Sequence, residues 1–283
     1  MKTIVLDTDV GADSDDAVAL GYLSAQVNKG RCKLPLITLS TSRKGAASFV
    51  RAVLSDYGVR SEIGRMEGFL ECDRTDHYAE KSMEKYGFSD GAKDAVEGWK
   101  EVYLSEEKIT PVVIGPQTNL AAFIRRHPVL FAQKTESVYV MGGNFSAEEA
   151  EYNVLCDLPA ALFVAGNTRG VPFFYLPFEE GIKVLTGRSF IGRRERPVGY
   201  ALKCTANAFG ITDEADMLRQ SWDPLTCLSA LSPEFFYAEG GAVSYSAQGI
   251  SAWERKGEKN SFLLRVKDAK LCEREIENAL SER

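Results

Sequence analysis

Five aspartates, Asp7, Asp9, Asp13, Asp15 and Asp16, follow a short apolar run at the N-terminus. Carboxylates this close in sequence repel one another unless protons or a cation neutralise them. Oxygen ligands suit a hard cation such as Ca²⁺ or Mg²⁺ rather than zinc. An EF-hand loop is excluded, because Ala12 and Val18 occupy the positions where that loop needs Gly and Glu. The run therefore predicts a site for a hard divalent cation.

The elements that must position this acidic run are predicted from apolar periodicity. Continuous apolar runs are typical of strands buried on both faces, and they occur at 3–6, 36–39, 111–114, 138–141 and 172–175. Helical patterns lie between them, as in 95–103. This alternation predicts an α/β fold: a doubly wound, mostly parallel central sheet with helices on both faces. Ligands bind at the carboxyl ends of such strands.

Two other corners of the predicted sheet carry polar residues. Gly115–Asn119 follows the strand at 111–114, and Gly142–Asn144 follows the strand at 138–141. The dinucleotide and P-loop glycine patterns are absent, as are H-E-x-x-H and G-x-S-x-G. A Mg²⁺-dependent phosphatase of the haloacid dehalogenase type also begins with a strand ending in Asp-x-Asp, and it would use Asp7 as nucleophile. That enzyme class stays open as an alternative.

The composition sets broader limits. The chain has 283 residues, 45% hydrophobic and 26% charged, with a net charge of -6. This acidic balance argues against a general nucleic-acid binder or a partner of anionic membranes. We expect a cytoplasmic protein, since we find neither a leader peptide nor a membrane-spanning run. The six cysteines are scattered without a C-x-x-C pair and are interpreted as small buried hydrophobic residues.

The chain shows no shift in composition and no repeat, so a single domain over 1–283 is expected. Residues 65–93 lack a clear period and are interpreted as a long active-site loop or lid. The segment from Ala242 to Phe262 predicts a small β region. A terminal helix carrying Ile276, Ala279 and Leu280 follows it.

Five motifs resemble those of the inosine-uridine-preferring nucleoside hydrolase family, in family order and over nearly the whole chain. They are Asp7-Thr8-Asp9-Val10-Gly11 with Asp15-Asp16-Ala17, Gly115-Pro116-Gln117-Thr118-Asn119, Met141-Gly142-Gly143, Ala150-Glu151-Tyr152-Asn153 and Trp222-Asp223-Pro224-Leu225. The resemblance implies a Ca²⁺-dependent enzyme that cleaves the N-glycosidic bond of ribonucleosides, and a homodimer or homotetramer. Its expected partner is a small-molecule ribonucleoside.

Site roles follow from the same resemblance. Asp9, Asp16, Asp223 and the backbone carbonyl of Ile114 would bind the metal, and Asp9 would also take the proton of the attacking water. The sugar would be held by Asp15, Glu151, Asn153 and Asn144. From the residues alone, Glu151 and Asn153 could instead cap a turn, and Asn144 could serve the turn after Gly143.

The sequence departs from the family pattern in its acidic run and at its second strand. Asp13 and Ser14 lengthen the run by two residues, so Asp13 could compete as a metal ligand. The segment 40–43 ends in Arg43 where many members have a Gly-Asn that reaches the ribose. A family member that binds nucleosides or Ca²⁺ without turnover is therefore a further alternative.

The residue before the late aspartate is also unusual. Many members have a His there as general acid, whereas this chain has Trp222. His127 is explained by its place at the end of a predicted helix, and His77 lies in the expected lid. We interpret Trp222 as stacking on the base and easing its protonation by solvent, which predicts a preference for purine nucleosides. An ordinary core Trp is the other interpretation.

Overall fold

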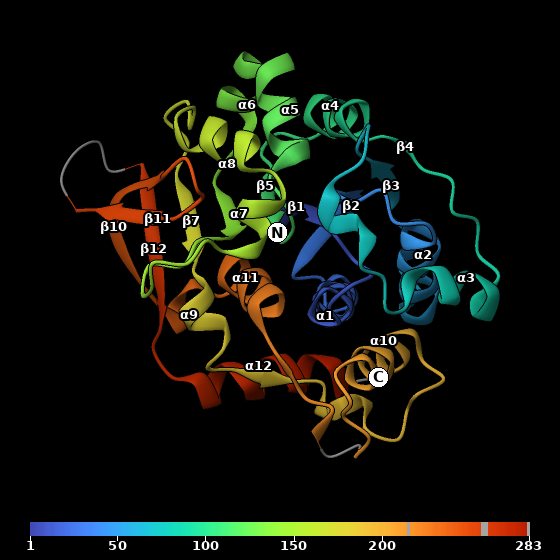
Figure 1. Ribbon diagram of the computed structural model, residues 1–283. Coiled ribbons are helices and arrows are strands. Elements are labelled where there is room, and N and C mark those ends of the chain that lie inside the picture. The colour runs from blue at the N-terminus through green and yellow to red at the C-terminus, as the bar shows by residue number, and fades with distance from the viewer. Residues whose placement is uncertain (214–215, 256–259, 282–283) are drawn as a thin grey trace.

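The computed structural model describes residues 1–213, 216–255 and 260–281 (Figure 1). Within this part of the chain, ten strands form one sheet in the order β11-β10-β12-β7-β6-β5-β1-β2-β3-β4, and two short strands, β8 and β9, pair separately. The strands are β1 (Lys2–Thr8), β2 (Cys32–Leu39), β3 (Glu62–Arg65), β4 (Lys93–Asp94), β5 (Thr110–Val113), β6 (Val138–Met141), β7 (Phe173–Leu176), β8 (Leu185–Thr186), β9 (Arg219–Gln220), β10 (Phe236–Tyr245), β11 (Ser251–Glu254) and β12 (Ser261–Val266).

Helices connect most of these strands. The α-helices are α1 (Asp15–Asn28), α2 (Ala46–Tyr57), α3 (Ala79–Tyr86), α4 (Ala95–Ser105), α5 (Thr118–Arg126), α6 (Pro128–Lys134), α7 (Tyr152–Cys156), α8 (Leu158–Ala165), α9 (Phe178–Gly181), α10 (Pro197–Ala208), α11 (Trp222–Leu231) and α12 (Ala269–Ser281). Short 3₁₀ turns are η1 (Glu71–Arg74), η2 (Arg188–Phe190) and η4 (Pro233–Phe235). None of the helices in the described ranges is long and apolar enough to cross a membrane.

The predicted doubly wound sheet is confirmed. Within the sheet, the successive strands β4-β3-β2-β1-β5-β6-β7-β12 pair in parallel, whereas β10 pairs antiparallel with both β12 and β11. From β1 the chain adds β2, β3 and β4 on one side and then returns to place β5 on the other side. The order of strands therefore reverses between β1 and β5, and such a reversal opens a crevice at the carboxyl ends of the two strands.

Both faces of the sheet are covered by helices. Ile4 and Leu6 of β1 pack in one hydrophobic cluster with α1, α2, α10, α11 and α12. Val5, which points to the other face, packs in a second cluster with α4, α5, α6 and α8. Figure 1 shows α4, α5, α6 and α8 above the central strands and α1, α11 and α12 below them. Alternate residues of one strand thus anchor two separate helix layers.

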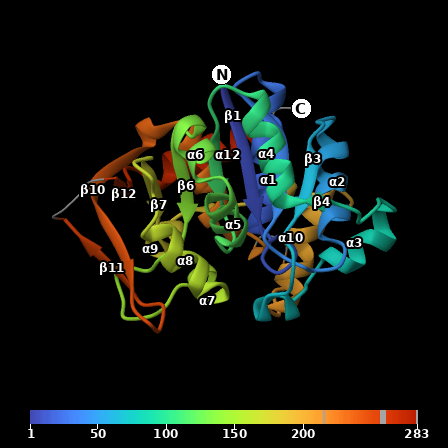
Figure 2. The same cartoon turned by 90° about the horizontal axis from the view of Figure 1, so that it is seen from above.

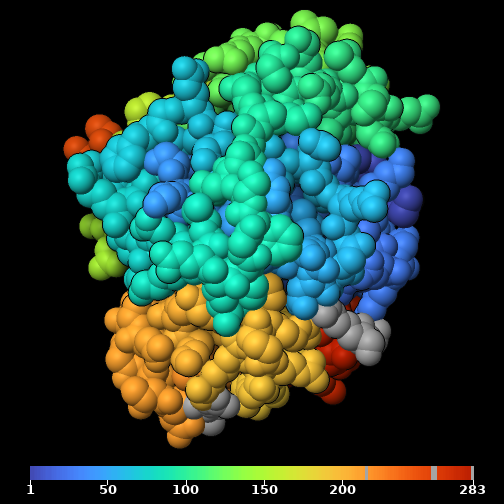
Figure 3. Space-filling model, turned by 90° about the vertical axis from the view of Figure 1, so that its right-hand side faces the viewer, coloured from blue at the N-terminus to red at the C-terminus, as the bar shows by residue number. Residues whose placement is uncertain are grey.

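The segment 65–93 is more ordered than predicted. It contains η1 and α3, and Tyr78 and Ser82 are fully buried. Tyr86 donates a hydrogen bond to the carbonyl oxygen of Glu195 at 2.9 Å, and the two segments lie side by side on the surface in Figure 3. The segment was expected to be a long active-site loop or lid, and its Thr75 and His77 do line the cavity described below. Helix α3 was not predicted because it buries mainly small residues, which give no apolar period.

The C-terminal β region belongs to the main sheet. Strand β12 is inserted between β7 and β10 and pairs with β7 in parallel, whereas β10 pairs with β12 and β11 in antiparallel fashion (Figure 2). Residues 256–259 of the predicted region lie outside the described residues. Helix α12 follows, and its Ile276, Ala279 and Leu280 are buried as predicted.

Candidate active site

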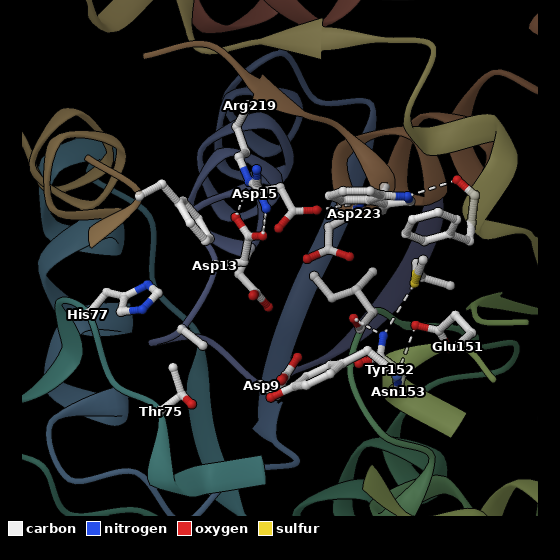
Figure 4. A pocket seen from close by; sticks show the side chains of 17 residues that line it. Asp9, Asp13, Asp15, Thr75, His77, Glu151, Tyr152, Asn153, Arg219 and Asp223 are labelled. Carbon is white, nitrogen blue, oxygen red and sulfur yellow. Dashed lines mark hydrogen bonds and ion pairs between the residues drawn. The ribbon is translucent and has the colours of Figure 1, made fainter. Parts of the chain in front are cut away.

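A cavity of about 420 Å³ opens at the carboxyl ends of β1, β5 and β6. Carboxylates, Asn153 and the Ile114 segment line one part of it, and aromatic side chains line another. Figure 4 shows the carboxylates of Asp9, Asp15 and Asp223 pointing toward the centre of this cavity. The structure therefore brings residues from both ends of the chain to the crevice that the sheet order creates.

Two helix N-termini supply the acidic cluster at the centre of the cavity. Asp15 and Asp16 lie in the first turn of α1, and Asp223 lies in the first turn of α11. Carboxylate oxygens of these three residues all lie within 4.8 Å of one another. The positive ends of both helix dipoles favour negative charge here, but they do not cancel the repulsion among three carboxylates. This oxygen-only donor set suits a hard divalent cation.

The electrostatics of the cluster show the same need for a counter-charge. Burial raises the pKa of Asp15, Asp16 and Asp223 well above the usual range, and repulsion from the neighbouring carboxylates raises it further. Hydrogen bonds offset little of this. Asp15 accepts one from the Asp223 backbone N–H at 3.3 Å, and Asp16 accepts one from the Thr8 hydroxyl. A bound cation would replace the protons that these groups otherwise retain.

Asp9 follows β1 and lies between the cluster and Arg43. Burial raises its pKa, while the Arg43 guanidinium, 3.5 Å from Asp9 Oδ2, lowers it. Gly115 leaves room for this side chain, since a Cβ there would lie 2.8 Å from Asp9 Oδ1. The glycine that follows β5 is thus required by close packing against Asp9.

Arg43 is buried and also ties the segment after β3 to the acidic corner. It donates hydrogen bonds to the backbone carbonyl oxygens of Asp9, of Thr75 at 2.6 Å and of Cys72 at 2.9 Å. Its guanidinium is therefore occupied by backbone partners. The segment after β2 therefore supplies a structural ion pair between Arg43 and Asp9, whereas many family members are expected to contact the ribose from this segment.

The residues after β6 border the predicted sugar end of the cavity. Asn153 donates from Nδ2 to the carbonyl oxygen of Ile114 at 3.0 Å, and Glu151 caps α7. Glu151 accepts hydrogen bonds from the backbone N–H groups of Asn153 at 2.9 Å, Val154 at 3.1 Å and Gly143 at 3.3 Å. Both Glu151 and Asn153 line the cavity, so the capping role and a sugar contact are compatible.

Two residues considered in the sequence analysis have other partners in the structure. Asn144 does not line the cavity, and its Oδ1 accepts hydrogen bonds from the backbone and hydroxyl of Ser146 instead. It serves the turn after Gly143. Asp13 lines the cavity but forms an ion pair with Arg219, so it is turned away from competition for the metal.

Asp7 is placed too deep for the role that the phosphatase alternative requires. It is fully buried, is absent from the cavity lining, and accepts hydrogen bonds at Oδ1 from the Thr38 hydroxyl at 2.7 Å and from Asn119 Nδ2 at 2.8 Å. Burial raises its pKa to about 7, which disfavours the ionised form. A nucleophile must be ionised and must reach the substrate, so this position argues against the phosphatase.

The remaining wall of the cavity is aromatic. Trp222 stacks against Phe178 with ring centroids 5.4 Å apart, and its Nε1 donates to the Phe178 carbonyl oxygen at 2.9 Å. Gly181 permits this position, because a Cβ there would lie 2.0 Å from Trp222 Cδ1. His77 lines the same cavity and meets Phe209 edge to face at 5.7 Å. His127 is not part of the lining.

Some lining residues were missed by the sequence analysis. Phe178, Phe209 and Arg219 belong to no motif, and they come from segments that carry no periodic signal. Arg219 reaches Asp13 across most of the length of the chain. Nothing in the sequence pattern indicates that pairing or the convergence of Phe178 and Phe209 on Trp222.

Comparison with known proteins adds family information to this geometry. The family model described as "Inosine-uridine preferring nucleoside hydrolase" matches residues 4–271. The chain is 30% identical over 178 residues to a protein named non-specific ribonucleoside hydrolase RihC from Salmonella enteritidis PT4 (strain P125109). That alignment covers 57% of this chain and 56% of the relative, so the chain spans about half the length of the curated relatives it matches.

Solved structures with the same fold cover nearly the full length. An inosine-uridine preferring nucleoside hydrolase from Bacillus anthracis superposes with a TM-score of 0.78 at 18% identity and covers 100% of both chains. A purine-preferring ribonucleoside hydrolase from Gardnerella vaginalis gives a TM-score of 0.78 at 17% identity, covering 99% of this chain and 98% of that one. These likenesses confirm the fold.

Proposed function

Because this chain belongs to the inosine-uridine preferring nucleoside hydrolase family, we propose that it hydrolyses the N-glycosidic bond of ribonucleosides to free base and ribose. The observation that carries this proposal is the composition of one cavity. Buried carboxylates from α1 and α11 adjoin an aromatic wall that includes Trp222 and Phe178. Such a cavity suits a neutral, polyhydroxylated sugar attached to a flat base.

The proposed metal is Ca²⁺. Asp16, Asp223, Asp9 and the carbonyl oxygen of Ile114 would hold it, and all four residues line the cavity. Two of these ligands, Asp16 and Asp223, belong to the cluster whose carboxylate oxygens lie within 4.8 Å of one another, and burial and mutual repulsion raise the pKa of both without a counter-charge. Asp15 is the third member of that cluster, and Asp9 lies beside it. When bound, the cation would supply a Lewis acid that lowers the pKa of water and binds vicinal hydroxyls.

The side chains around that position have separate proposed roles. Asp9 accepts the proton of the attacking water, and Arg43 beside it favours the ionised carboxylate that this step requires. Asp15 accepts a hydrogen bond from a ribose hydroxyl, and Glu151 and Asn153 hold the 5′-hydroxyl end. Negative charge around the ribose also stabilises the oxocarbenium character that develops when the base departs.

The aromatic wall supports a preference for purines. The Trp222 indole N–H is used by the Phe178 carbonyl, so this residue can contact the base only through its ring, which stacks beside that of Phe178. A two-ring base gains more stacking contact from such a surface than a one-ring base does. The similar proteins include both a purine-preferring hydrolase and a non-specific one, and a panel of nucleosides distinguishes the two cases.

Ribose release from a panel of nucleosides tests the proposal. The panel contains inosine, guanosine, adenosine, uridine and cytidine, each assayed with and without a strong chelator, with Ca²⁺ or Mg²⁺ added back. Asp9→Asn is the test variant, and Asp94→Asn, at the N-cap of α4, is the matched control. We expect release that is lost on chelation and in Asp9→Asn, is restored best by Ca²⁺ and is fastest with purines.

Other outcomes identify the alternatives. Phosphate release from nucleotides or sugar phosphates in excess of base release would favour the phosphatase. Tight binding of ribose or nucleosides without any product would favour a binding protein that lacks turnover. A higher kcat/KM for uridine than for the purine nucleosides would overturn the purine preference alone.

A further inference from the structure

Arg219 is fixed in the cavity wall by Asp13. Its Nε donates to Asp13 Oδ1 at 2.6 Å, and its Nη2 donates to Asp13 Oδ2, which makes a bidentate ion pair. The guanidinium carbon lies 5.0 Å from the centroid of the Phe209 ring and 5.5 Å from that of Trp222. A bidentate carboxylate and two ring contacts together fix both the position and the plane of the cation.

The guanidinium keeps hydrogen-bonding capacity toward the cavity. It has five N–H groups. Among the described residues, Asp13 takes two of them, and Gln220 Oε1 accepts a third from Nη1 at 2.9 Å. One N–H therefore remains on each terminal nitrogen, and the side chain is only partly buried and lines the cavity.

Arg219 lies at the end of the cavity where the base would leave. In Figure 4 Arg219 lies above Asp15 and Asp223, whereas Asp9, Glu151 and Asn153 lie below them. Glu151 and Asn153, which are proposed to hold the sugar, thus lie on the other side of these two aspartates from Arg219. A nucleoside whose ribose lies against the carboxylates would therefore extend its base toward Arg219 and Trp222.

We propose that Arg219 is a catalytic residue that stabilises the departing base by donating hydrogen bonds to its ring nitrogen and carbonyl acceptors. Asp13 is the positioning residue that holds it. The inference rests on the proposed function. The proposal gives this chain a residue that assists departure of the base, although Trp222 occupies the position where many family members have a His.

The step balances without a further reactant. The water oxygen bonds to C1′ and its proton goes to Asp9, while the electron pair of the C1′–N bond goes to the base. Negative charge then spreads over the ring nitrogens and exocyclic oxygen, where the Arg219 N–H groups stabilise it. The base finally takes one proton from solvent, so Arg219 itself stays protonated throughout.

This role predicts which base is favoured. Guanine and hypoxanthine present two neighbouring acceptors, O6 and N7, which an arginine can engage together. Adenine presents an amino group in place of O6, and that group cannot accept a hydrogen bond from a cation. Arg219 should therefore favour inosine and guanosine over adenosine.

Comparing two leaving groups separates this role from a structural one. The wild-type protein, Arg219→Met and Arg219→Lys are assayed on inosine, on adenosine and on 4-nitrophenyl riboside, whose leaving group departs without assistance. We expect Arg219→Met to lower kcat for inosine about 100-fold and kcat for 4-nitrophenyl riboside less than about 3-fold. Arg219→Lys, which keeps the charge, should give an intermediate loss, and the excess of inosine over adenosine should shrink in both variants.

Arg196→Met is the matched control. Arg196 donates from Nε and Nη2 to Asp56 and lies over the rings of Tyr57 and Phe190, so it has the same surroundings outside the cavity. Arg196→Met should change neither the ratio of kcat for inosine to kcat for 4-nitrophenyl riboside nor the ratio of kcat for inosine to kcat for adenosine.

Equal losses on inosine and on the nitrophenyl substrate, or no loss on inosine, would overturn the role of Arg219 while leaving the hydrolase intact. A wild-type protein that cleaves only the nitrophenyl substrate would overturn it too. A wild-type protein inactive on every riboside would overturn the proposed function itself.

Discussion

The side-chain amide of Asn153 donates a hydrogen bond to the backbone carbonyl oxygen of Ile114, the oxygen assigned to the metal. A carbonyl oxygen has two lone pairs, so one can face a cation while the other accepts from Asn153. Asn153 would therefore orient a metal ligand and also border the sugar. Replacing a partner of this kind typically lowers metal affinity or activity by about 10- to 100-fold.

Replacing Asn153 with Leu should weaken Ca²⁺ binding about 10-fold, because the Ile114 carbonyl loses the group that orients it. Calorimetric titration of the metal-free protein with Ca²⁺ measures this. Asn167→Leu is the control, since Asn167 makes the same kind of bond, to the carbonyl of Phe163 at 2.8 Å, outside the cavity. Unchanged affinity in Asn153→Leu would remove Asn153 from the metal site.

Trp222 is expected to contribute mainly through its ring face. Trp222→Ala should lower kcat/KM for inosine by roughly 5- to 160-fold, the equivalent of a stacking contribution of about 1–3 kcal/mol. Trp222→Phe should lose less, because a smaller ring still stacks. The control is Trp253→Ala, a partly buried tryptophan that meets Phe145. A Trp222→Ala protein with wild-type kcat/KM for inosine would contradict base stacking here.

Arg43 should be important for stability as well as for the site. Arg43→Met leaves the Asp9 carboxylate buried without its cation and removes three bonds to backbone carbonyls. Breaking one side of a buried ion pair typically costs about 3–5 kcal/mol, so the free energy of unfolding should fall by that amount. Denaturant titration of the metal-free protein measures it.

Arg74→Met is the control for that experiment. Arg74 pairs with Glu71 on an exposed surface of the same segment, and exposed pairs contribute little. Its removal should leave the unfolding midpoint unchanged. An unchanged unfolding midpoint in Arg43→Met as well would show that the Asp9 carboxylate is neutralised in another way.

Glu151 should make the stability of the metal-free protein depend on pH. Burial raises the pKa of Glu151 to about 7, although backbone hydrogen bonds from Asn153, Val154 and Gly143 lower it. Between its usual pKa of 4.5 and about 7, the folded state holds a proton that the unfolded state has released. The stability due to this group is therefore greatest below the lower value, and it is lost as pH rises through the window.

Denaturant titrations of the wild-type protein and of Glu151→Gln at pH 5 and pH 8, both with chelator, measure this effect. From pH 5 to pH 8 the free energy of unfolding of the wild-type protein should fall relative to that of Glu151→Gln, because glutamine does not titrate. An equal difference in unfolding free energy between the two proteins at pH 5 and at pH 8 would show that Glu151 keeps one protonation state across this range.

Much of the fold followed from apolar runs, because the five central strands are buried on both faces. Strands β3 and β4 were missed because they are short and partly polar, and Gly64 interrupts the first of them. The parallel pairing of β12 with β7 was also missed. It depends on contacts between distant segments and leaves no local period in the sequence.

The site was predicted in part. All of the acidic run except Asp7 lines the cavity, and Gly115, Glu151, Asn153 and Trp222 border or shape it, because strand ends converge there. The ion pair of Asp13 with Arg219 joins segments far apart in the chain, so no motif contains it. The roles of the site residues stay predictions, as do the homodimer or homotetramer and the single domain over 1–283.

The insertion of β12 between β7 and β10 also affects how the protein is made. As the chain leaves the ribosome, β7 can pair with β6 on one side, but its other edge waits for residues 261–263. Until then an edge containing Phe173 and Tyr175 is exposed, and open apolar edges promote association between chains. Release of a nascent chain before β12 is synthesised should therefore yield aggregates, because folding of the sheet cannot finish until residues 261–263 have left the ribosome.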